Sequence, residues 1–351
     1  MLMNAQSKNQ LSAADQATRA KTLIRYFAIP AALVIGFTII FVALEIFCHI
    51  VGQPYSEKLT VNETASGRFD SELGWSYIPN LSTVKTYGTA KRAVHLYFDE
   101  NGIRVPTADT KLDPTRPSVL FVGCSVTMGH GLPYEESLAG QFGALREVPY
   151  QVVNLGVQGY GTDQSLLMLK RFLPKFNTKV VVYTLISDHP IRNKNYDRRM
   201  LVPNLRYLGT KPLFKVNRKN ELYLARKPLL YKDYRNSRLV DFIIMRLGGM
   251  LDIFPPYGTK LAKALIQEMK RYTEAQGVRF VMINWRWTQE DFIPLDFFKG
   301  LDLEDNLIDT LKDAPPDFAA MRIPGDGHPD ARANAHVARL LLKYFESRNL
   351  V

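Results

Sequence analysis

The chain has 351 residues, 46% hydrophobic and 23% charged, the composition of a globular protein with room for one large domain and an appendage. Its formal net charge of +11 is concentrated, because residues 191–240 hold 14 Lys and Arg against 3 Asp and Glu. The sequence shows no internal repeat, dinucleotide-binding glycine fingerprint or Walker loop, which excludes repeat proteins and the common nucleotide-binding classes.

An uncharged segment from Phe27 to Leu44 predicts a membrane-spanning helix. Its residues, at about 1.5 Å each, give about 27 Å of helix, close to the thickness of the hydrocarbon core, and Ile46 to Val51 can extend it. We therefore expect a transmembrane helix over residues 26–51. A cleavable signal peptide is the alternative, but the residues after Leu44 are bulky where a cleavage site needs small ones.

The charges before this helix predict its orientation. The tail of residues 1–25 carries four Lys or Arg residues against one acidic residue, so the positive-inside rule places it in the cytoplasm. We expect a single-pass protein of the inner (cytoplasmic) membrane whose catalytic domain is periplasmic or extracellular.

The remaining sequence divides into a lead-in, residues 52–112, and a main domain, residues 113–351. The lead-in is rich in Gly, Pro, Ser and Thr, and we expect a small β-rich segment packed on the main domain. In the main domain, apolar runs alternate with helical stretches, which predicts a parallel sheet with helices on both faces. The expected strands are 118–122, 151–154, 180–186 and 278–284, and the expected helices are 137–145, 162–172, 260–275 and 331–346.

Three short segments at expected strand ends or helix starts carry chemically useful residues. Ser125 lies in a glycine-flanked turn directly after the first strand of the main domain. A glycine-rich turn, Asn154–Gly161, could present backbone N–H groups to an oxyanion. Near the C-terminus, Gly325–Pro329 contains Asp326 and His328, which can complete a hydrolytic triad with a serine. Ligands of parallel-sheet folds lie at the carboxyl ends of strands, so we expect these segments to converge.

In this order the three segments resemble the GDSL-like, or SGNH, hydrolase superfamily over roughly residues 118–344. The resemblance implies a three-layer α/β/α fold with a flavodoxin-like parallel sheet, and no metal or cofactor. It implies Ser125 as the nucleophile with Asp326 and His328 as its partners. It also implies the backbone N–H groups of Ser125 and Gly159 as oxyanion donors.

Two positions depart from the family's pattern. Cys124 stands where the family usually has Asp, and the third block, Leu185-Ile186-Ser187-Asp188, replaces the usual Gly-x-Asn-Asp. Ser187 could therefore donate the hydrogen bond that Asn supplies in the family, and losing such a donor costs about 10²- to 10³-fold in rate. The Asp-x-His spacing resembles the branch related to polysaccharide O-acetyltransferases.

An insertion at about residues 190–258 follows the third block and holds the concentrated positive charge. Aromatic residues interleaved with the basic ones could stack on bases or on sugars. Outside the membrane the available polyanions are acidic polysaccharides and lipid headgroups, so we expect no nucleic-acid partner. Glycan binding and a solvated basic face resting on anionic lipid both remain open.

The sequence leaves three functional hypotheses. The first is a membrane-anchored serine esterase that acts on acyl esters, chiefly acetyl esters, of an extracellular glycan. The second is an O-acyltransferase of a cell-surface polysaccharide, supplied by an acyl-donor membrane protein. The third is a catalytically inactive glycan-binding or assembly protein, favoured by Cys124 and by the missing Asn. Hydrolase and transferase share all their catalytic residues, so the sequence does not separate them.

Overall fold

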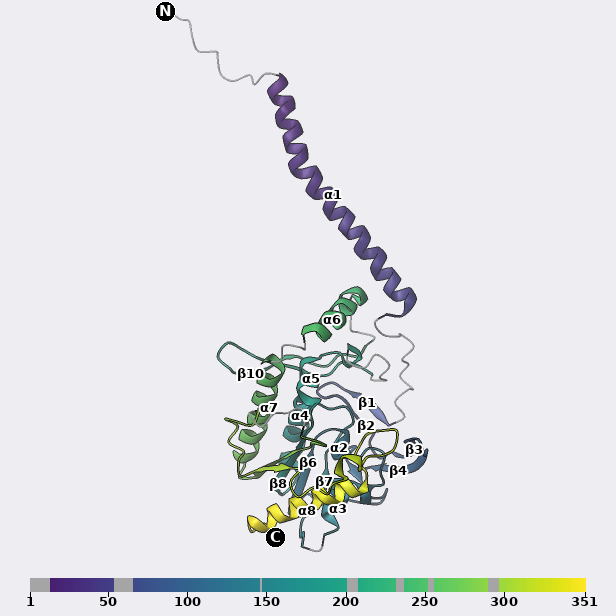
Figure 1. The fold of residues 1–351 in the computed structure, drawn as a ribbon, viewed down its shortest axis with the longest axis vertical. Helices are drawn as coiled ribbons and strands as arrows, with labels where there is room; N and C mark the ends of the chain where they lie inside the picture. The colour runs from purple at the N-terminus through teal and green to yellow at the C-terminus, as the bar shows by residue number, and fades with distance from the viewer. Residues whose placement is uncertain are drawn as a thin grey trace, which may run out of the picture. The chain divides into compact units, whose positions relative to one another are not determined.

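The computed structural model of the protein describes residues 13–53, 66–145, 147–200, 208–231, 237–251, 256–289 and 297–351. Figure 1 shows how its helices and strands are connected. The α-helices in these ranges are α1 (Ala13–Val51), α2 (Ser125–Met128), α3 (Leu138–Gly143), α4 (Thr162–Phe172), α5 (His189–Lys194), α6 (Arg238–Leu251), α7 (Pro256–Glu274) and α8 (Ala331–Ser347). The strands are β1 (Gly67–Asp70), β2 (Gly74–Tyr77), β3 (Ser82–Tyr87), β4 (Arg92–Phe98), β5 (Arg104–Val105), β6 (Ser118–Val122), β7 (Gln151–Asn154), β8 (Thr178–Leu185), β9 (Leu213–Val216), β10 (Leu222–Arg226), β11 (Arg279–Asn284) and β12 (Leu307–Asp309).

A mixed sheet forms the centre of the α/β fold, with the described strands in the order β12-β11-β8-β6-β7-β5-β4-β3. From β12 to β7 neighbouring strands run parallel, as the alternation of strands and helices predicts. Strands β5, β4 and β3 continue the sheet beyond β7 in antiparallel pairs. The four strands expected in the main domain are all present, whereas the sequence does not predict β12 or the antiparallel extension.

Helices cover both faces of the sheet, which makes the sheet the middle of three layers. On one face, Phe121 of β6 packs on Phe142 of α3, with ring centroids 5.7 Å apart, and α3 packs against α8. On the other, the Tyr183 hydroxyl of β8 donates to Thr162 of α4 over 2.9 Å, and α4 and α5 pack against α7. Strands buried on both faces consist of nearly continuous apolar residues, which is why β6 and β8 are recognisable in the sequence.

The region from 67 to 105 supplies β1 to β5 and contacts two loops of the main domain. The turn of the β3–β4 hairpin lies on one loop, where the Thr89 N–H donates to the Pro324 carbonyl over 3.0 Å. A Cβ atom at Gly88 would lie 2.8 Å from the same oxygen, so this contact requires glycine. From β2, Trp75 Nε1 donates to the Gln158 carbonyl of the second loop over 2.9 Å. The lead-in is therefore continuous with the main sheet.

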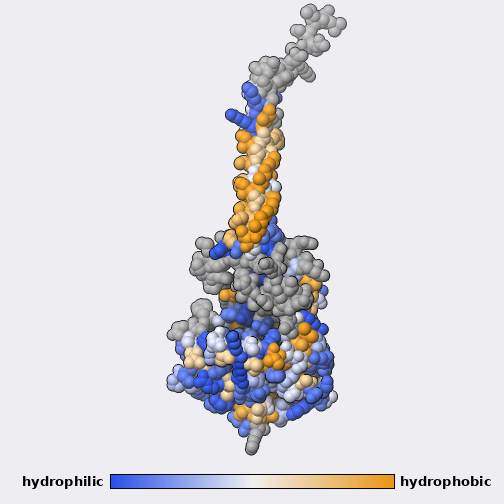
Figure 2. Space-filling view, turned by 90° about the vertical axis from the view of Figure 1, so that its right-hand side faces the viewer, coloured by the Kyte–Doolittle hydropathy of each residue, from blue (hydrophilic) through white to orange (hydrophobic). Residues whose placement is uncertain are grey.

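Helix α1 and most of α6 form one compact unit, and the chain from residue 58 forms the other, apart from 236–248. The segment Ile24–Val51 of α1 is long and apolar enough to cross a membrane, and its large apolar side chains are exposed (Figure 2). Near its end, Glu45 accepts hydrogen bonds from Ser237 Oγ (2.6 Å) and from the Arg238 and Leu239 N–H groups (both 2.9 Å). The Glu45 carboxylate thus accepts hydrogen bonds from backbone N–H groups in the first turn of α6 and caps that helix. Residues 1–12 of the expected cytoplasmic tail lie outside the described residues.

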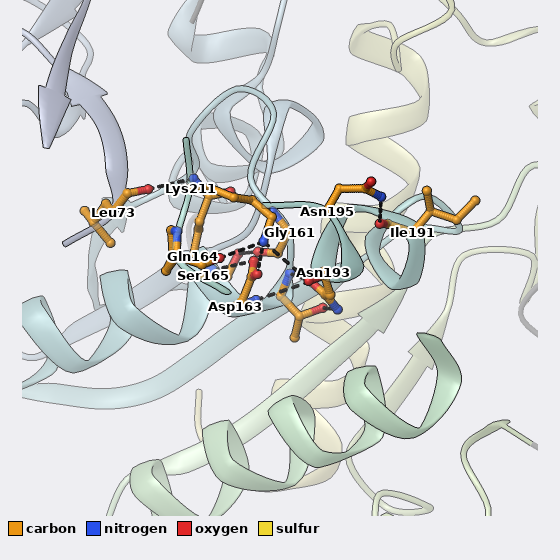
Figure 3. A network of polar contacts seen from close by, with 11 residues as sticks. Leu73, Gly161, Asp163, Gln164, Ser165, Ile191, Asn193, Asn195 and Lys211 are labelled. Atoms are coloured by element: carbon orange, nitrogen blue, oxygen red, sulfur yellow. Dashed lines mark hydrogen bonds and ion pairs between the residues drawn. The ribbon is translucent and has the colours of Figure 1, made fainter. Parts of the chain in front are cut away.

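A buried ion pair connects the insertion to the main body (Figure 3). Lys211 Nζ contacts the carboxylate of Asp163 at the start of α4, and both side chains are fully buried. Lys211 also donates to the Pro212 carbonyl over 2.9 Å, and nearby Asn193 Oδ1 accepts the Thr162 N–H over 2.8 Å. Part of the positive charge of the insertion is therefore structural. The insertion segments 201–207, 232–236 and 252–255 lie outside the described residues.

Replacing Lys211 by Met should leave Asp163 buried without its cation and lower the free energy of unfolding by about 3 to 5 kcal/mol. The double variant Lys211→Met/Asp163→Asn should be less destabilised, because the orphaned charge is gone. Denaturant unfolding of the full chain in detergent micelles measures both. Lys343→Met, which removes an exposed pair with Asp313, is the control and should cost under about 1 kcal/mol. Equal losses for the Lys211 and Lys343 variants would contradict a structural role for the buried pair.

Candidate active site

The turn after β6 is shaped by close packing around Gly123. A Cβ atom at this position would lie 2.2 Å from Thr127 Oγ1, so a larger residue would force the turn apart. Ser125 begins α2 and is 5% exposed. Its carbonyl accepts the N–H groups of both Gly129 and His130 over 3.0 Å, which closes the one-turn helix. The sequence thus fixes Ser125 on a short, rigid turn at the carboxyl end of a buried strand.

The glycine-rich loop after β7 lies directly against this turn. The Val157 N–H donates to the Gly123 carbonyl over 3.1 Å, and a Cβ atom at Gly156 would lie 2.3 Å from the Met128 nitrogen. Gly159 is buried in this loop and has a left-handed φ of 80°, a conformation that favours glycine. The spacing between the loop and α2 therefore depends on glycines.

The segment that carries the acid and base candidates folds back on itself. The Asp326 N–H donates to the Ile323 carbonyl over 3.1 Å, and the Ile323 N–H donates to the His328 carbonyl over 2.8 Å. Gly325 and Gly327 adopt φ values of 75° and 86°, which most other residues would adopt only with strain. This tight turn explains how an Asp two residues before a His can reach its imidazole.

The three residues proposed as a triad lie together. His328 Nε2 is 2.8 Å from Ser125 Oγ, and His328 Nδ1 contacts Asp326 Oδ1. An ionised carboxylate only accepts hydrogen bonds, so Nδ1 carries the proton and Nε2 is free to accept one from the serine hydroxyl. Burial by itself would raise the pKa of Asp326, but the hydrogen bond from His328 and the neighbouring imidazoles lower it below its usual value. Asp326 is therefore ionised at neutral pH.

A second histidine, which the sequence analysis misses, lies beside this pair. His130 Nε2 is 3.3 Å from Asp326 Oδ2, and the rings of His130 and His328 have centroids 4.2 Å apart. The ring of Tyr87 meets His130 nearly edge-on at 4.7 Å. Burial, and then repulsion from a charged His328, lower the pKa of His130 to about 4. His130 follows Ser125 by five residues, the one signal in the sequence that could have drawn attention to it.

Ligand atoms of His130, Asp326 and His328 lie within 4.8 Å of one another, close enough to contact one metal ion. Each oxygen of the Asp326 carboxylate already faces an imidazole nitrogen, at Oδ1 from His328 and at Oδ2 from His130. A metal ion would have to replace the proton between Asp326 and His328. The arrangement therefore fits proton transfer better than metal binding.

Arg104 of β5 holds the loop after α2 and is also absent from the sequence-based site. Arg104 is 2% exposed, and its guanidinium donates to the Gly129 carbonyl over 2.8 Å. It also contacts the carbonyl oxygens of Met128 and Leu132. These contacts fix the backbone on both sides of His130. No sequence pattern around Arg104 predicts them.

The oxyanion residues predicted from the sequence differ in their surroundings. Among the described residues, neither the N–H of Ser125 nor that of Gly159 has a hydrogen-bond partner, so both can serve an oxyanion. Ser187 is exposed in the turn after β8, a strand that pairs with β6. Its role as a third donor stays a prediction. Cys124 is fully buried, which makes its thiol inaccessible as a nucleophile.

No protein-family profile matches the chain, and no curated protein matches it in sequence. Among solved structures it is similar to that of TesA, with 12% identity, a TM-score of 0.40 and coverage of 66% of this chain and 98% of that one. A lipolytic G-D-S-L family protein from Veillonella parvula has 11% identity, a TM-score of 0.30 and coverages of 66% and 98%. A catalytic mutant of Axe2, an acetylxylan esterase from Geobacillus stearothermophilus, has 15% identity and a TM-score of 0.35. That match covers 65% of this chain and 93% of the esterase chain. The Veillonella protein is named as a member of the G-D-S-L family, which the sequence motifs of this chain resemble.

The buried, neutral His130 should make stability depend on pH. Its pKa is about 4 in the folded protein and about 6.5 when unfolded, so below pH 6.5 the unfolded chain binds more protons. The free energy of unfolding should therefore fall as the pH drops from 6.5 to 4, with about 3 kcal/mol of the loss due to His130. Denaturant unfolding across this window should show a shallower fall for His130→Gln. His95→Gln, at an exposed histidine, is the control, and an unchanged slope in His130→Gln would contradict the assignment.

Proposed function

We propose that this protein is a serine-dependent ester hydrolase, anchored in a membrane by α1, that removes acyl groups, chiefly acetyl groups, from a glycan outside the cytoplasm. One observation carries the proposal: Ser125 Oγ lies 2.8 Å from His328 Nε2, while the other ring nitrogen of His328 faces the Asp326 carboxylate. These three side chains supply the nucleophile, base and orienting acid that ester hydrolysis requires.

The geometry supports a two-step reaction at Ser125. His328 Nε2 takes the proton from the serine hydroxyl as Oγ attacks the ester carbonyl, and Asp326 stabilises the imidazolium that forms. The N–H groups of Ser125 and Gly159 stabilise the oxyanion, and His328 then protonates the leaving alcohol. Water, activated by the same imidazole, hydrolyses the acyl-serine. In an acyltransferase, a sugar hydroxyl would take the place of that water.

Hydrolysis of a chromogenic acetate ester by the full chain in detergent micelles tests the triad. Ser125→Ala and His328→Ala should each lower kcat by about 10⁴-fold or more, because each removes a group that acts in the transition state. A fluorophosphonate probe should label Ser125 in the wild-type chain. Cys124→Ala is the matched control at the neighbouring position and should remain active.

The same assay distinguishes the alternatives. Turnover that survives in Ser125→Ala would refute the triad. Absence of both turnover and probe labelling in the wild-type chain would favour a non-catalytic glycan-binding protein. Acetyl transfer to an added oligosaccharide, in preference to water, would identify an acyltransferase.

Membrane anchoring is supported by the exposed apolar surface of α1. The segment Ile24–Val51 would extend over about 42 Å of helix, more than the hydrocarbon core requires. Its one acidic side chain, Glu45, lies near the end of this segment and is satisfied by hydrogen bonds from the start of α6. The basic tail before the helix favours a cytoplasmic N-terminus, which would leave the active site outside.

A glycan substrate is supported by the exposed surface of the β9–β10 hairpin. Five basic residues are exposed on this hairpin against one exposed acid, Glu221. A neighbouring groove of about 700 Å³ is lined in part by Asn220, Lys260 and Lys263. Exposed Tyr223 adds a ring that can stack on a sugar. The five basic residues of the hairpin are Lys215, Arg218, Lys219, Arg226 and Lys227.

Removing positive charge from this hairpin should lower activity only on anionic polymer substrates. The triple variant Lys215→Gln/Arg218→Gln/Lys219→Gln should lower kcat/KM for an O-acetylated acidic polysaccharide about tenfold at low salt, because attraction to the polyanion is lost. Its kcat/KM for the small chromogenic ester should not change. Lys312→Gln/Lys343→Gln, on another part of the surface, is the control. An equal loss on a neutral acetylated polysaccharide would argue against an acidic glycan.

A further inference from the structure

We propose that His130 is a positioning residue of the triad: its neutral imidazole donates Nε2–H to Asp326 Oδ2 and holds the carboxylate in line with His328. The inference rests on the proposed function and deepens it, because it gives the site a fourth residue. It starts from the 3.3 Å distance between His130 Nε2 and Asp326 Oδ2.

The two oxygens of the Asp326 carboxylate have different partners. Oδ1 contacts His328 Nδ1 and also accepts the His328 N–H over 3.3 Å. Oδ2 faces His130, and among the described residues it has no other polar contact. Without His130, the carboxylate would be held through Oδ1 alone, and among the described residues Oδ2 would have no polar contact. His130 therefore supplies the second attachment of the carboxylate, which fixes the plane in which Oδ1 meets His328.

His130 is itself fixed relative to the nucleophile. Its backbone N–H donates to the Ser125 carbonyl over 3.0 Å, and its ring is held between Tyr87 and His328. The side chain is only 10% exposed. Ser125 and His130 belong to one segment, and Asp326 and His328 to another. The His130–Asp326 contact thus joins the two segments a second time, in addition to the contact between Ser125 and His328.

The charge of the site requires His130 to be neutral. An ionised carboxylate only accepts hydrogen bonds, so Nε2 carries the proton and Nδ1 is left as an acceptor, which is buried and lacks a partner among the described residues. A cationic His130 would instead neutralise the charge on which the His328 imidazolium depends. The titratable groups around His130 are Asp326, His328 and Tyr87, with Lys85 also close enough to affect its charge. Burial lowers the pKa of His130 by more than the charge of Asp326 raises it, so the ring stays neutral.

Two substitutions separate the hydrogen bond from ring packing. His130→Phe keeps a planar ring but removes the donor, and kcat for the chromogenic ester should fall about 10- to 100-fold with KM unchanged, as expected for one hydrogen bond to a charged group. His130→Gln restores an N–H donor and should recover much of the rate. Wild-type kcat in His130→Phe would overturn the proposal, as would a Gln variant as slow as the Phe variant.

A spectroscopic measurement tests the positioning without catalysis. In the full Ser125→Ala chain labelled with ¹⁵N-histidine, His130 should be neutral with its proton on Nε2 at pH 7. The His328 Nδ1–H proton should resonate far downfield and weaken when His130→Phe is added. A proton on Nδ1 of His130, or an unchanged His328 signal, would overturn the proposal. If these signals behave as expected while the wild-type chain neither hydrolyses ester nor reacts with the fluorophosphonate, the proposed function fails and the positioning stands.

Discussion

The site depends on one buried cation, Arg104. Removing a guanidinium from water costs several kcal/mol, and here the compensation comes from three backbone carbonyl oxygens at the end of α2 and in the loop after it. Because β5 pairs with both β4 and β7, the same residue connects the antiparallel part of the sheet to the turn that contains Ser125. Displacing that loop would leave a buried charge without partners, so the position of Ser125 and His130 is strongly specified.

The lead-in stabilises each part of the site separately. Arg104 contacts the turn that follows Ser125, Trp75 donates to the Gln158 carbonyl of the glycine-rich loop, and Thr89 donates to the Pro324 carbonyl near Asp326. These contacts come from three different strands or turns between residues 67 and 105. A parallel sheet brings the strand ends together, but loops beyond those ends need further support. The antiparallel extension supplies it.

The sequence predicts the elements whose signal is local. Continuous apolar runs identify β6 and β8, and the glycine turns, with Asp326 and His328, point to the proposed triad. Lys211 could not be placed, because a lysine in a basic insertion looks like surface charge until the fold brings it to Asp163. The sequence marks His130 only by its spacing from Ser125 and does not mark Arg104, because their contacts join residues far apart in the chain. Pairing of β5 with β7 likewise depends on tertiary structure rather than on β propensity.

The two imidazoles beside Asp326 illustrate how burial assigns roles to identical groups. A single carboxylate at this distance can stabilise one imidazolium effectively, and a second positive ring 4.2 Å away would repel the first. The His328 side chain is 27% exposed, whereas that of His130 is 10% exposed. Burial lowers the pKa of His130 and keeps that ring neutral, whereas His328 Nε2 lies 2.8 Å from Ser125 Oγ, within reach of its proton. If both rings were equally exposed, either could bind the proton, and Asp326 would be shared between two bases, only one of which faces the serine.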